Sequence, residues 1–473
     1  MDITFLLNGE VVSLSNVSPT TTLLDWLREE RGLTGTKEGC NEGDCGACSV
    51  MITDENGSRA LNGCILFLPQ VNGKAVTTVE GMASADGTLH PVQETMIEHH
   101  GSQCGFCTPG FVVSMATAHL NGATDHDVQL AGNLCRCTGY APIIRAAEAA
   151  GGAPVPAHLR SLKDKLAQDI PAPAKGDGAP HVQPENSDAL AAWYLDNPQA
   201  TLIAGATDVG LWVNKSHARF NGVIDLGKVQ ALRHIEKDTC ALTIGAGVTL
   251  AESIAPLSAL ASDLGPLLHR FGSRQVRAQA TVGGNIANGS PIGDLAPALI
   301  ALAASVHLAS ANGERTVALE SFFIDYGKQD IAPGEIVASI SVPLNAHTDF
   351  HCWKISKRFD QDISAVCGAF GLTIENNIIT SARIAFGGMA ATPRRATLCE
   401  QALIGQSVHR DLLSSASEAL SKDFAPISDM RASASYRMRA AQGLLERCLR
   451  SINGETTPQL FSDVEALEVP ARG

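Results

Sequence analysis

The sequence predicts an α+β multidomain protein. Its 473 residues, at roughly 150 residues per domain, suggest about three domains. Eight of the 13 cysteines lie before residue 138 in two clusters, and the later sequence combines strand-like and helix-like apolar spacing with small-residue turns. We therefore expect small cysteine-rich domains first and larger α+β domains after them.

The charge balance and the apolar segments exclude several kinds of partner. Lys and Arg total 35 against 49 Asp and Glu, a formal charge of -14, and no basic run offers a track for nucleic acid or anionic lipid. The longest apolar stretch, Leu295 to Ala309, is interrupted by Pro297 and falls short of the roughly 20 residues of a membrane-spanning helix. The N-terminus lacks the features of an export signal. We expect a cytoplasmic protein whose closely spaced thiols bind metal rather than form disulfides.

The first cysteine cluster has the spacing of a plant-type [2Fe-2S] centre. A C-x4-C-x2-C run is followed by a fourth cysteine after fifteen residues, and the four expected ligands are Cys40, Cys45, Cys48 and Cys64. Glycines at 39, 43 and 46 permit a loop that curls around a cluster and aims amide N–H groups at its sulfurs. The alternative is zinc, which the five-residue step between the first two ligands fits poorly.

The segments around this loop predict a β-grasp-like domain that ends near Val79. Residues 1–14 alternate apolar side chains around Asn8-Gly9, a strong hairpin signal. Residues 22–30 predict a short helix, and residues 48–52 predict a strand that leaves the loop.

The second cluster combines a C-x2-C pair with a C-x-C pair, and its four thiols are Cys104, Cys107, Cys135 and Cys137. Pro109 opens a helical pattern over residues 111–120, and residues 124–127 cap a second helix. Two antiparallel helices would return the chain to its start, so that the loops at their ends hold one cluster. The tight C-x-C step favours a second [2Fe-2S] centre over zinc. The scattered cysteines are predicted to be core thiols: Cys240, Cys352, Cys367, Cys399 and Cys448.

A linker and two glycine turns organise the second half. Residues 151–183 are rich in proline and glycine around a polar helix near 159–169, which predicts an exposed connection. A strand at 200–204 then runs into a glycine turn, and a second glycine turn starts at residue 281. Such turns expose backbone N–H groups that bind pyrophosphate, although a glycine after a strand is more often only a turn. Residues 245–247 lack the third glycine of a Rossmann nucleotide site.

Several motifs resemble one known family. The ferredoxin-like run followed by CGFCTPG and LCRCTGY resembles the iron-sulfur module of the molybdenum hydroxylases, the family of xanthine dehydrogenase and aldehyde oxidase, over residues 1 to about 155. LIAGATDVGLWVNK and ATVGGNIANGSPIGDLAPAL resemble the two flavin loops of that family, whose FAD domain is similar in fold to the vanillyl-alcohol oxidase flavoproteins. Residues from about 351 to 461, with strands near 365–374 and 378–386, resemble its C-terminal flavin-subunit domain.

The resemblance implies a domain order. It runs from a plant-type [2Fe-2S] ferredoxin domain (1–80) and a helical [2Fe-2S] domain (81–155) through a linker (156–185) to an FAD-binding α+β domain (186–350), a C-terminal α+β flavoprotein domain (351–462) and a tail (463–473).

The resemblance also implies which residues contact FAD. The first loop would surround the pyrophosphate and ribityl chain with Leu202, Ile203, Ala204, Gly205, Ala206, Thr207, Asp208 and Val209. The second loop would contribute Thr281, Gly284, Asn285 and Asp294, the last by a hydrogen bond to the cofactor. Phe271 would stack near the isoalloxazine, Ile336 and Val337 would border the flavin or adenine, and Lys354 would help fix the cofactor. Residues 357–362 match a loop that influences nicotinamide access. Without the resemblance, alternative roles stay open for these positions. Phe271 could be a core aromatic residue and Lys354 a surface charge, and Arg394 and Arg395 could be solvated charges at the start of a helix.

The implied function is electron transfer without a catalytic side chain of its own. The chain resembles the small subunit of bacterial xanthine dehydrogenases, and a partner chain would carry the molybdenum cofactor and hydroxylate xanthine or hypoxanthine to urate. Electrons would pass from molybdenum to the Cys104 centre, the Cys40 centre, FAD and then NAD+, in a heterotetramer with two copies of each chain. Open alternatives are the iron-sulfur and flavin subunit of an aldehyde, nicotinate or carbon monoxide enzyme, a stand-alone NADH-dependent reductase, and a zinc-stabilised scaffold without flavin.

Overall fold

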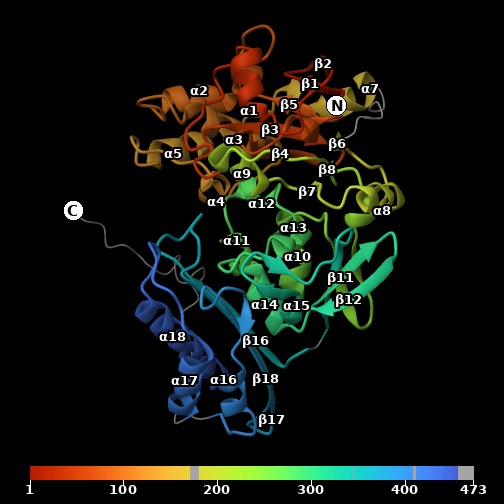
Figure 1. Cartoon of the computed structure of the whole chain (residues 1–473). Coiled ribbons are helices and arrows are strands. Elements are labelled where there is room, and N and C mark those ends of the chain that lie inside the picture. The colour runs from red at the N-terminus through yellow and green to blue at the C-terminus, as the bar shows by residue number, and fades with distance from the viewer. Residues whose placement is uncertain (171–180, 345, 409–411, 456–473) are drawn as a thin grey trace, which may run out of the picture. The chain divides into compact units, whose positions relative to one another are not determined.

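The computed structural model describes residues 1–170, 181–344, 346–408 and 412–455 (Figure 1). Contacts divide the chain into two compact units. Unit 1 comprises Met1–Ala231, Thr249–Glu252 and Gly272–Gly284, and unit 2 comprises Leu232–Val248, Ser253–Phe271 and Asn285–Gly473. The predicted tail and part of the predicted linker, residues 171–180, lie outside the described residues. Among the described helices, none is long and apolar enough to cross a membrane.

Unit 1 begins with a five-stranded sheet in the order β2-β1-β5-β3-β4. Its strands are β1 (Ile3–Leu7), β2 (Glu10–Leu14), β3 (Ser49–Asp54), β4 (Gly57–Asn62) and β5 (Ala75–Thr77). The predicted hairpin is confirmed: β1 and β2 pair antiparallel. Asn8 and Gly9 turn the chain at φ 51° and 85°, the left-handed pair that a tight two-residue hairpin requires.

A short helical segment packs on this sheet. Thr22 Oγ1 accepts a hydrogen bond from Asp25 N at 3.1 Å and so caps α1 (Leu23–Asp25), which continues as a π-helix, η1 (Trp26–Glu30). The helix predicted at 22–30 is therefore present, with a wider second half. The rings of Trp26 and Phe5 meet edge to face at 5.5 Å, in one apolar core with Leu27.

The next part of unit 1 is helical: α2 (Pro91–Glu98), α3 (Thr108–Leu120), α4 (His126–Leu130) and α5 (Ala141–Ala150). Pro109 lies in the first turn of α3, as predicted. The prediction of two comparable antiparallel helices is wrong, because α4 has only five residues. The chain leaves α4 near Gly132, and Leu134 N then donates to Cys45 O at 2.9 Å instead of continuing the helix.

The last part of unit 1 is built on a small parallel sheet in the order β6-β8-β7. Its elements are α6 (Ala157–Arg160), α7 (Leu162–Asp169), β6 (His181–Val182), α8 (Ser187–Asp196), β7 (Thr201–Ile203), α9 (Val209–Ser216), β8 (Val223–Asp225) and α12 (Arg274–Arg277). The predicted helix near 159–169 is confirmed by α6 and α7, and the strand predicted at 200–204 is confirmed by β7.

Unit 2 contains a five-stranded antiparallel sheet in the order β12-β11-β15-β10-β9. Its strands are β9 (Ile235–Lys237), β10 (Ala241–Gly245), β11 (Ser305–Ser310), β12 (Gly313–Ala318) and β15 (Ile336–Pro343). The accompanying elements are α11 (Leu264–His269), α14 (Leu295–Ala301), α15 (Leu319–Phe322), β13 (Phe323–Asp325) and β14 (Lys328–Gln329). Two helices contain residues of both units, α10 (Leu250–Leu260) and α13 (Val282–Asn288).

Unit 2 ends with a four-stranded antiparallel sheet and three helices (Figure 1). These elements are β16 (Asp349–Ile355), β17 (Val366–Glu375), β18 (Ile378–Gly387), β19 (Arg394–Arg395), α16 (Thr397–Leu403), α17 (Leu412–Asp423) and α18 (Ala434–Ile452). The strands predicted near 365–374 and 378–386 are confirmed. The helices pack their apolar faces on the sheet, where Phe386 meets Phe370 and Phe424 edge to face at 5.6 Å each.

Two predictions from isolated residues are wrong in unit 2. Arg394 and Arg395 form β19 rather than a helix start. Arg394 is exposed, as the alternative of a solvated charge requires, whereas Arg395 is ion-paired with Glu320 at 3.0 Å and Glu400 at 2.7 Å. Cys240 is exposed rather than a core thiol, because it lies in the turn before β10, where its N–H donates to Asp238 at 2.6 Å. The other four scattered cysteines are buried, as predicted.

Candidate iron-sulfur and flavin sites

The first four cysteines come together in unit 1. Cys48 Sγ and Cys64 Sγ lie 3.3 Å apart. Cys40 Sγ accepts hydrogen bonds from the backbone N–H groups of Asp44 at 3.4 Å and Cys45 at 3.3 Å. The thiols of Cys45 and Cys64 hold the pKa of Cys40 well below its usual range. The contact with Cys40, together with burial, raises the pKa of Cys45 and of Cys64 in turn. The loop thus aims amides at a sulfur, as predicted, and favours the thiolate form of Cys40.

The second four cysteines are more open to solvent. Cys135 is buried and Cys107 is partly buried, whereas Cys104 and Cys137 are exposed. Partial burial opposes the thiolate of Cys135, but hydrogen bonds from Thr138 outweigh it and lower the pKa of Cys135. A backbone hydrogen bond from Phe106 lowers the pKa of Cys104. Cys104 and Cys137 therefore face water, whereas Cys135 lies inside the protein.

Each thiol set brings its four sulfurs together. In the first set, close contacts join Cys45 with Cys40, Cys40 with Cys64, and Cys64 with Cys48. In the second set, they join Cys107 with Cys135 and Cys104 with Cys137. Four cysteine thiolates are the ligand number of a [2Fe-2S] cluster. The donors of each set therefore fit one such cluster.

The segments that carry the two thiol sets meet at a seam lined by glycines. A Cβ on Gly46 would lie 2.3 Å from Gly132 O, and a Cβ on Gly110 would lie 2.2 Å from Gly46 O. Through the hydrogen bond from Leu134 N to Cys45 O, a cysteine of the first set contacts the residue next to Cys135 of the second. Because backbone lies directly against backbone here, a side chain at Gly46 or Gly110 would push the two cysteine-bearing segments apart.

A buried glutamine from α12 enters the same seam. Gln275 is 1% exposed, and its Nε2 lies 3.1 Å from Asn133 Oδ1, 3.3 Å from Ser49 Oγ and 3.4 Å from Ser114 Oγ. Asn133 in turn donates to Gly46 O at 2.9 Å. The sequence prediction missed Gln275, and no local pattern marks it, because its partners lie 142 to 226 residues away.

The first predicted flavin loop follows β7 in unit 1. A Cβ on Gly205 would lie 2.1 Å from Gln279 O, and Ala206 has φ 56°, so this turn accepts only small residues. It leads into the N-terminal end of α9, where helix N–H groups favour a phosphate. Ala204 O is fixed by a hydrogen bond from Gln70 Nε2 at 2.9 Å. A contact of these residues with the pyrophosphate of FAD stays a prediction.

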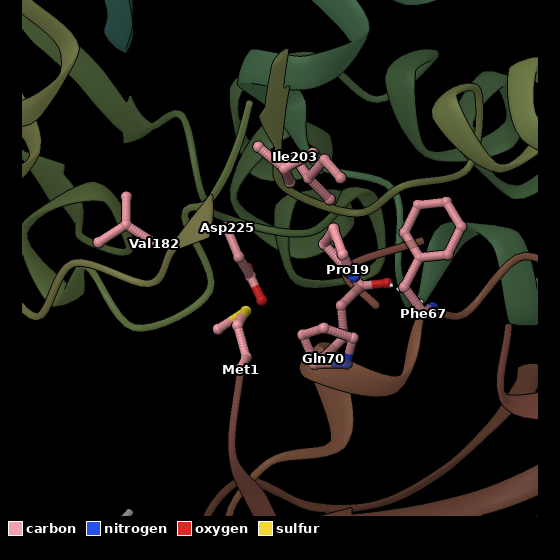
Figure 2. Close-up of a pocket in the computed structure, with 9 residues that line it drawn as sticks. Met1, Pro19, Phe67, Gln70, Val182, Ile203 and Asp225 are labelled. Carbon is pink, nitrogen blue, oxygen red and sulfur yellow. Dashed lines mark hydrogen bonds between the residues drawn. The ribbon is translucent and has the colours of Figure 1, made fainter. Parts of the chain in front are cut away.

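A small cavity lies beside this loop (Figure 2). Ile203 and Asp225 of the parallel sheet line it together with Met1, Phe67 and Gln70. Its volume is about 10 Å³, room for about one water molecule. Burial raises the pKa of Asp225, whose carboxylate accepts a hydrogen bond from Gln183 Nε2 at 2.9 Å. This cavity is too small for a cofactor.

The residues predicted for the second flavin loop are distributed between the units. Thr281 and Gly284 belong to unit 1, where Thr281 Oγ1 accepts a hydrogen bond from Gly284 N at 3.1 Å and caps α13. Asn285, Asp294 and Lys354 belong to unit 2.

Asp294 and Lys354 form a buried ion pair. Their N···O distance is 2.7 Å, and the side chain of Lys354 is only 2% exposed. Lys354 Nζ also donates to Asp362 O at 3.0 Å and Arg270 O at 3.2 Å, and Asp294 Oδ1 accepts from Ser364 Oγ at 2.5 Å. Lys354 is therefore not a surface charge. All three acceptors of Lys354 Nζ belong to the protein itself. A contact of Lys354 or Asp294 with FAD stays a prediction.

The burial and position of the remaining predicted flavin residues do not assign them a role toward a cofactor. Ile336 and Val337 are buried at the start of β15, and Phe271 is partly buried. In the predicted access loop, Arg270 stacks over Phe359 at 4.7 Å, and Gln361 has φ 52°. The roles of these residues toward FAD and NAD+ stay predictions.

Four family models match the sequence. A 2Fe-2S iron-sulfur cluster binding domain matches residues 5–66, and a [2Fe-2S] binding domain matches residues 78–148. The FAD binding domain in molybdopterin dehydrogenase matches residues 177–345, and the CO dehydrogenase flavoprotein C-terminal domain matches residues 351–452. The predicted α+β multidomain fold with two iron-sulfur domains and an FAD-binding domain is confirmed.

Curated relatives are xanthine dehydrogenases. That of Drosophila subobscura is 32% identical over 490 residues, which cover 88% of this chain and 36% of the relative. Xanthine dehydrogenase/oxidase of Gallus gallus is 29% identical over 510 residues, which cover 89% of this chain and 37% of the relative. This chain thus spans little more than a third of the length of these relatives.

Solved structures of carbon monoxide dehydrogenases share part of the fold. One from Hydrogenophaga pseudoflava, which lacks the Mo-pyranopterin moiety, has a TM-score of 0.55 and 25% identity, covering 59% of this chain and 98% of its own. Reconstituted CO dehydrogenase from Oligotropha carboxidovorans has a TM-score of 0.55 and 24% identity, covering 60% of this chain and 100% of its own.

Proposed function

We propose that this chain, an iron-sulfur and FAD portion of a molybdenum hydroxylase related to xanthine dehydrogenases and carbon monoxide dehydrogenases, is the electron-transfer part of a xanthine dehydrogenase. It accepts electrons from a molybdenum-cofactor partner that hydroxylates xanthine or hypoxanthine to urate, and it delivers them to NAD+. When bound, the [2Fe-2S] clusters supply one-electron chemistry and FAD supplies the conversion to a hydride. One observation carries the proposal: each set has four cysteines, and the loops that carry the two sets hydrogen-bond to each other within one unit.

The contacts within unit 1 arrange the candidate sites in series. The loop of the second thiol set, whose Cys104 and Cys137 are exposed, contacts the loop of the first set through the Leu134–Cys45 hydrogen bond. The first set contacts α9, which follows the predicted pyrophosphate loop, through a 2.7 Å hydrogen bond from Asn214 Nδ2 to Cys64 O. This order supports the route from a partner to the second set, then to the first set, and on to FAD.

An apolar surface supports a partner at the outer thiol set. Phe106, Leu134 and Tyr140, which neighbour Cys104 and Cys137 in the sequence, are 48%, 38% and 38% exposed. Apolar and aromatic side chains exposed beside a redox site are typical of a surface that another protein covers. The molybdenum partner docks here, and the assembly is a cytoplasmic heterotetramer with two copies of each chain.

The relatives favour xanthine as the substrate. The xanthine dehydrogenases are 29–33% identical over most of this chain, whereas the solved carbon monoxide and quinoline enzymes are 22–25% identical over about three fifths of it. The same family of folds nevertheless serves several substrates, so the assay must include them.

The test is to isolate the native complex and measure NAD+ reduction with xanthine, hypoxanthine, simple aldehydes and carbon monoxide. Reduction with the purines supports the proposal, and reduction only with an aldehyde or carbon monoxide overturns the substrate. A chain that is isolated alone and is fully active as an NADH-dependent reductase overturns the partner. A chain without visible flavin and iron-sulfur absorption, but with bound zinc, overturns the electron-transfer role.

A further inference from the structure

Helix α9 contributes two side chains to the loop that carries the first thiol set. Asn214 Nδ2 donates to Cys64 O at 2.7 Å, to Asn41 Oδ1 at 3.1 Å and to Asn41 O at 3.3 Å. Lys215 Nζ donates to Cys40 O at 2.6 Å and lies 3.3 Å from Glu42. All of these residues belong to unit 1, although 150 to 175 residues of chain separate the partners.

These contacts join the two ends of the thiol set. Cys40 is its first cysteine in the sequence and Cys64 its last, so neighbouring residues of α9 hold the backbone of both. The loop between Cys40 and Cys45 contains Asn41 at φ 56° and Gly43 at φ 78°. These are left-handed conformations that residues other than glycine and asparagine rarely adopt. Hydrogen bonds from outside the loop therefore help to keep its shape.

The helix itself approaches the loop at backbone distance. A Cβ on Gly210 would lie 2.9 Å from Ile65 Cβ and 3.1 Å from Ile65 Cα. Gln279, which borders the turn at Gly205, donates to Ile65 O at 3.4 Å. The Cys64–Ile65 segment is thus fixed by α9 and by the residues that shape the predicted pyrophosphate loop.

We propose that Asn214 and Lys215 are positioning residues of the first iron-sulfur site, which fix its ligand loop and raise its reduction potential. The inference rests on the proposed function, because it requires a cluster at these cysteines. A reduced cluster carries one more negative charge than an oxidised cluster, and its potential responds to nearby charge and hydrogen bonding. The Lys215 ammonium stabilises that charge, whereas Glu42 and the exposure of both side chains, 45% and 42%, moderate the effect.

The two residues make separable contributions. Lys215 acts mainly through its charge, which arginine preserves and methionine removes. Asn214 acts through its two N–H groups, which aspartate cannot supply although it has nearly the same shape. Ser216 is exposed on the same helix, and its replacement by alanine changes neither the charge nor the contacts of Asn214 and Lys215.

The experiment compares full-length holoprotein with Lys215→Met, Lys215→Arg, Asn214→Ala, Asn214→Asp and Ser216→Ala. Redox titration followed by electron paramagnetic resonance gives the potential and line shape of each cluster, and the Cys104→Ser variant identifies the signal of the second set. Lys215→Met should shift the potential of the first cluster to a more negative value, and Lys215→Arg should restore it. Both Asn214 variants should change its line shape. Ser216→Ala and the second cluster should be unaffected.

Unchanged potential and line shape in iron-loaded Lys215→Met and Asn214→Asp would overturn the inference and leave the proposed function intact. Equal shifts of both clusters would also overturn it, because the contacts reach only the first set. If Asn214→Ala fails to retain iron, the comparison of Lys215→Met with Lys215→Arg still tests the inference. The Lys215 side chain is 45% exposed, so its replacement should leave the fold intact. Wild-type chain without iron-sulfur signals would instead refute the proposed function.

Discussion

Replacing Lys354 by methionine tests what the buried ion pair of unit 2 does. The substitution leaves the Asp294 carboxylate, 3% exposed, with the Ser364 hydroxyl but without its cation. It also removes the donor to two backbone carbonyls, at Arg270 and Asp362. Breaking a buried pair from one side costs about 3–5 kcal/mol, because an uncompensated charge stays buried. For a unit of this size the loss corresponds to a melting temperature about 10 °C lower.

Differential scanning calorimetry of the FAD-loaded full chain measures this loss. Lys357→Met is the matched control, because Lys357 is exposed in the adjoining loop and its replacement should change stability by no more than about 0.5 kcal/mol. The double variant Lys354→Met/Asp294→Asn removes the buried charge while keeping an acceptor for Ser364, and it should recover much of the lost stability.

Two results would refute this reasoning. One is a cost below about 1 kcal/mol for Lys354→Met, which would mean that the pair is open to solvent. The other is a double variant that is no more stable than the single variant, which would mean that the buried charge of Asp294 is not the cause. A lower FAD content in Lys354→Met with little loss of stability would favour direct contact of Lys354 with the cofactor.

Two further predictions concern unit 1. Gly46→Ala should push the loops of the two thiol sets apart and lower the iron content of the purified chain, because its Cβ would lie 2.3 Å from Gly132 O. Gly32→Ala is the control, since Gly32 has the same φ of 68° with open space around it. Comparable iron loss in both variants would implicate backbone strain alone. Burial, with help from two neighbouring histidines, lowers the pKa of His90 from 6.5 to about 4. The unfolded chain therefore binds the proton first as pH falls below 6.5, and the stability that neutral His90 contributes is lost from there down to about pH 4. His90→Asn keeps an acceptor for the N–H of Val92 and should flatten the pH dependence of the unfolding midpoint; an unchanged slope would contradict the assignment.

The features that could be predicted from the sequence depend on near neighbours in the chain. The turn at Asn8-Gly9 requires only two residues with left-handed backbone. The contact between Cys40 and Cys45 follows largely from cysteine spacing within residues 40–48. Such local constraints act in any fold that contains the segment.

The features that could not be predicted depend on distant contacts. After the end of α4 at Leu130, Leu134 bonds to the distant Cys45. Asn214 and Gln275 have hydrogen-bond partners more than 140 residues away. The burial of Lys354 follows from its pairing with Asp294, 60 residues earlier. A single sequence gives hydropathy and spacing, but the register between separate segments is set by packing.

The most direct test of the electron-transfer role is xanthine reduction of the native complex with Cys104→Ser in this chain. The account predicts that FAD content is retained, that NADH still reduces the flavin, and that xanthine reduces it much more slowly than in wild type. The reason is that the proposed partner docks at the second thiol set, whose Cys104 and Cys137 are exposed. Stopped-flow absorbance follows the flavin, and electron paramagnetic resonance confirms loss of one iron-sulfur signal. Flavin reduction by xanthine at the wild-type rate, in a variant that has lost this signal, would contradict the account.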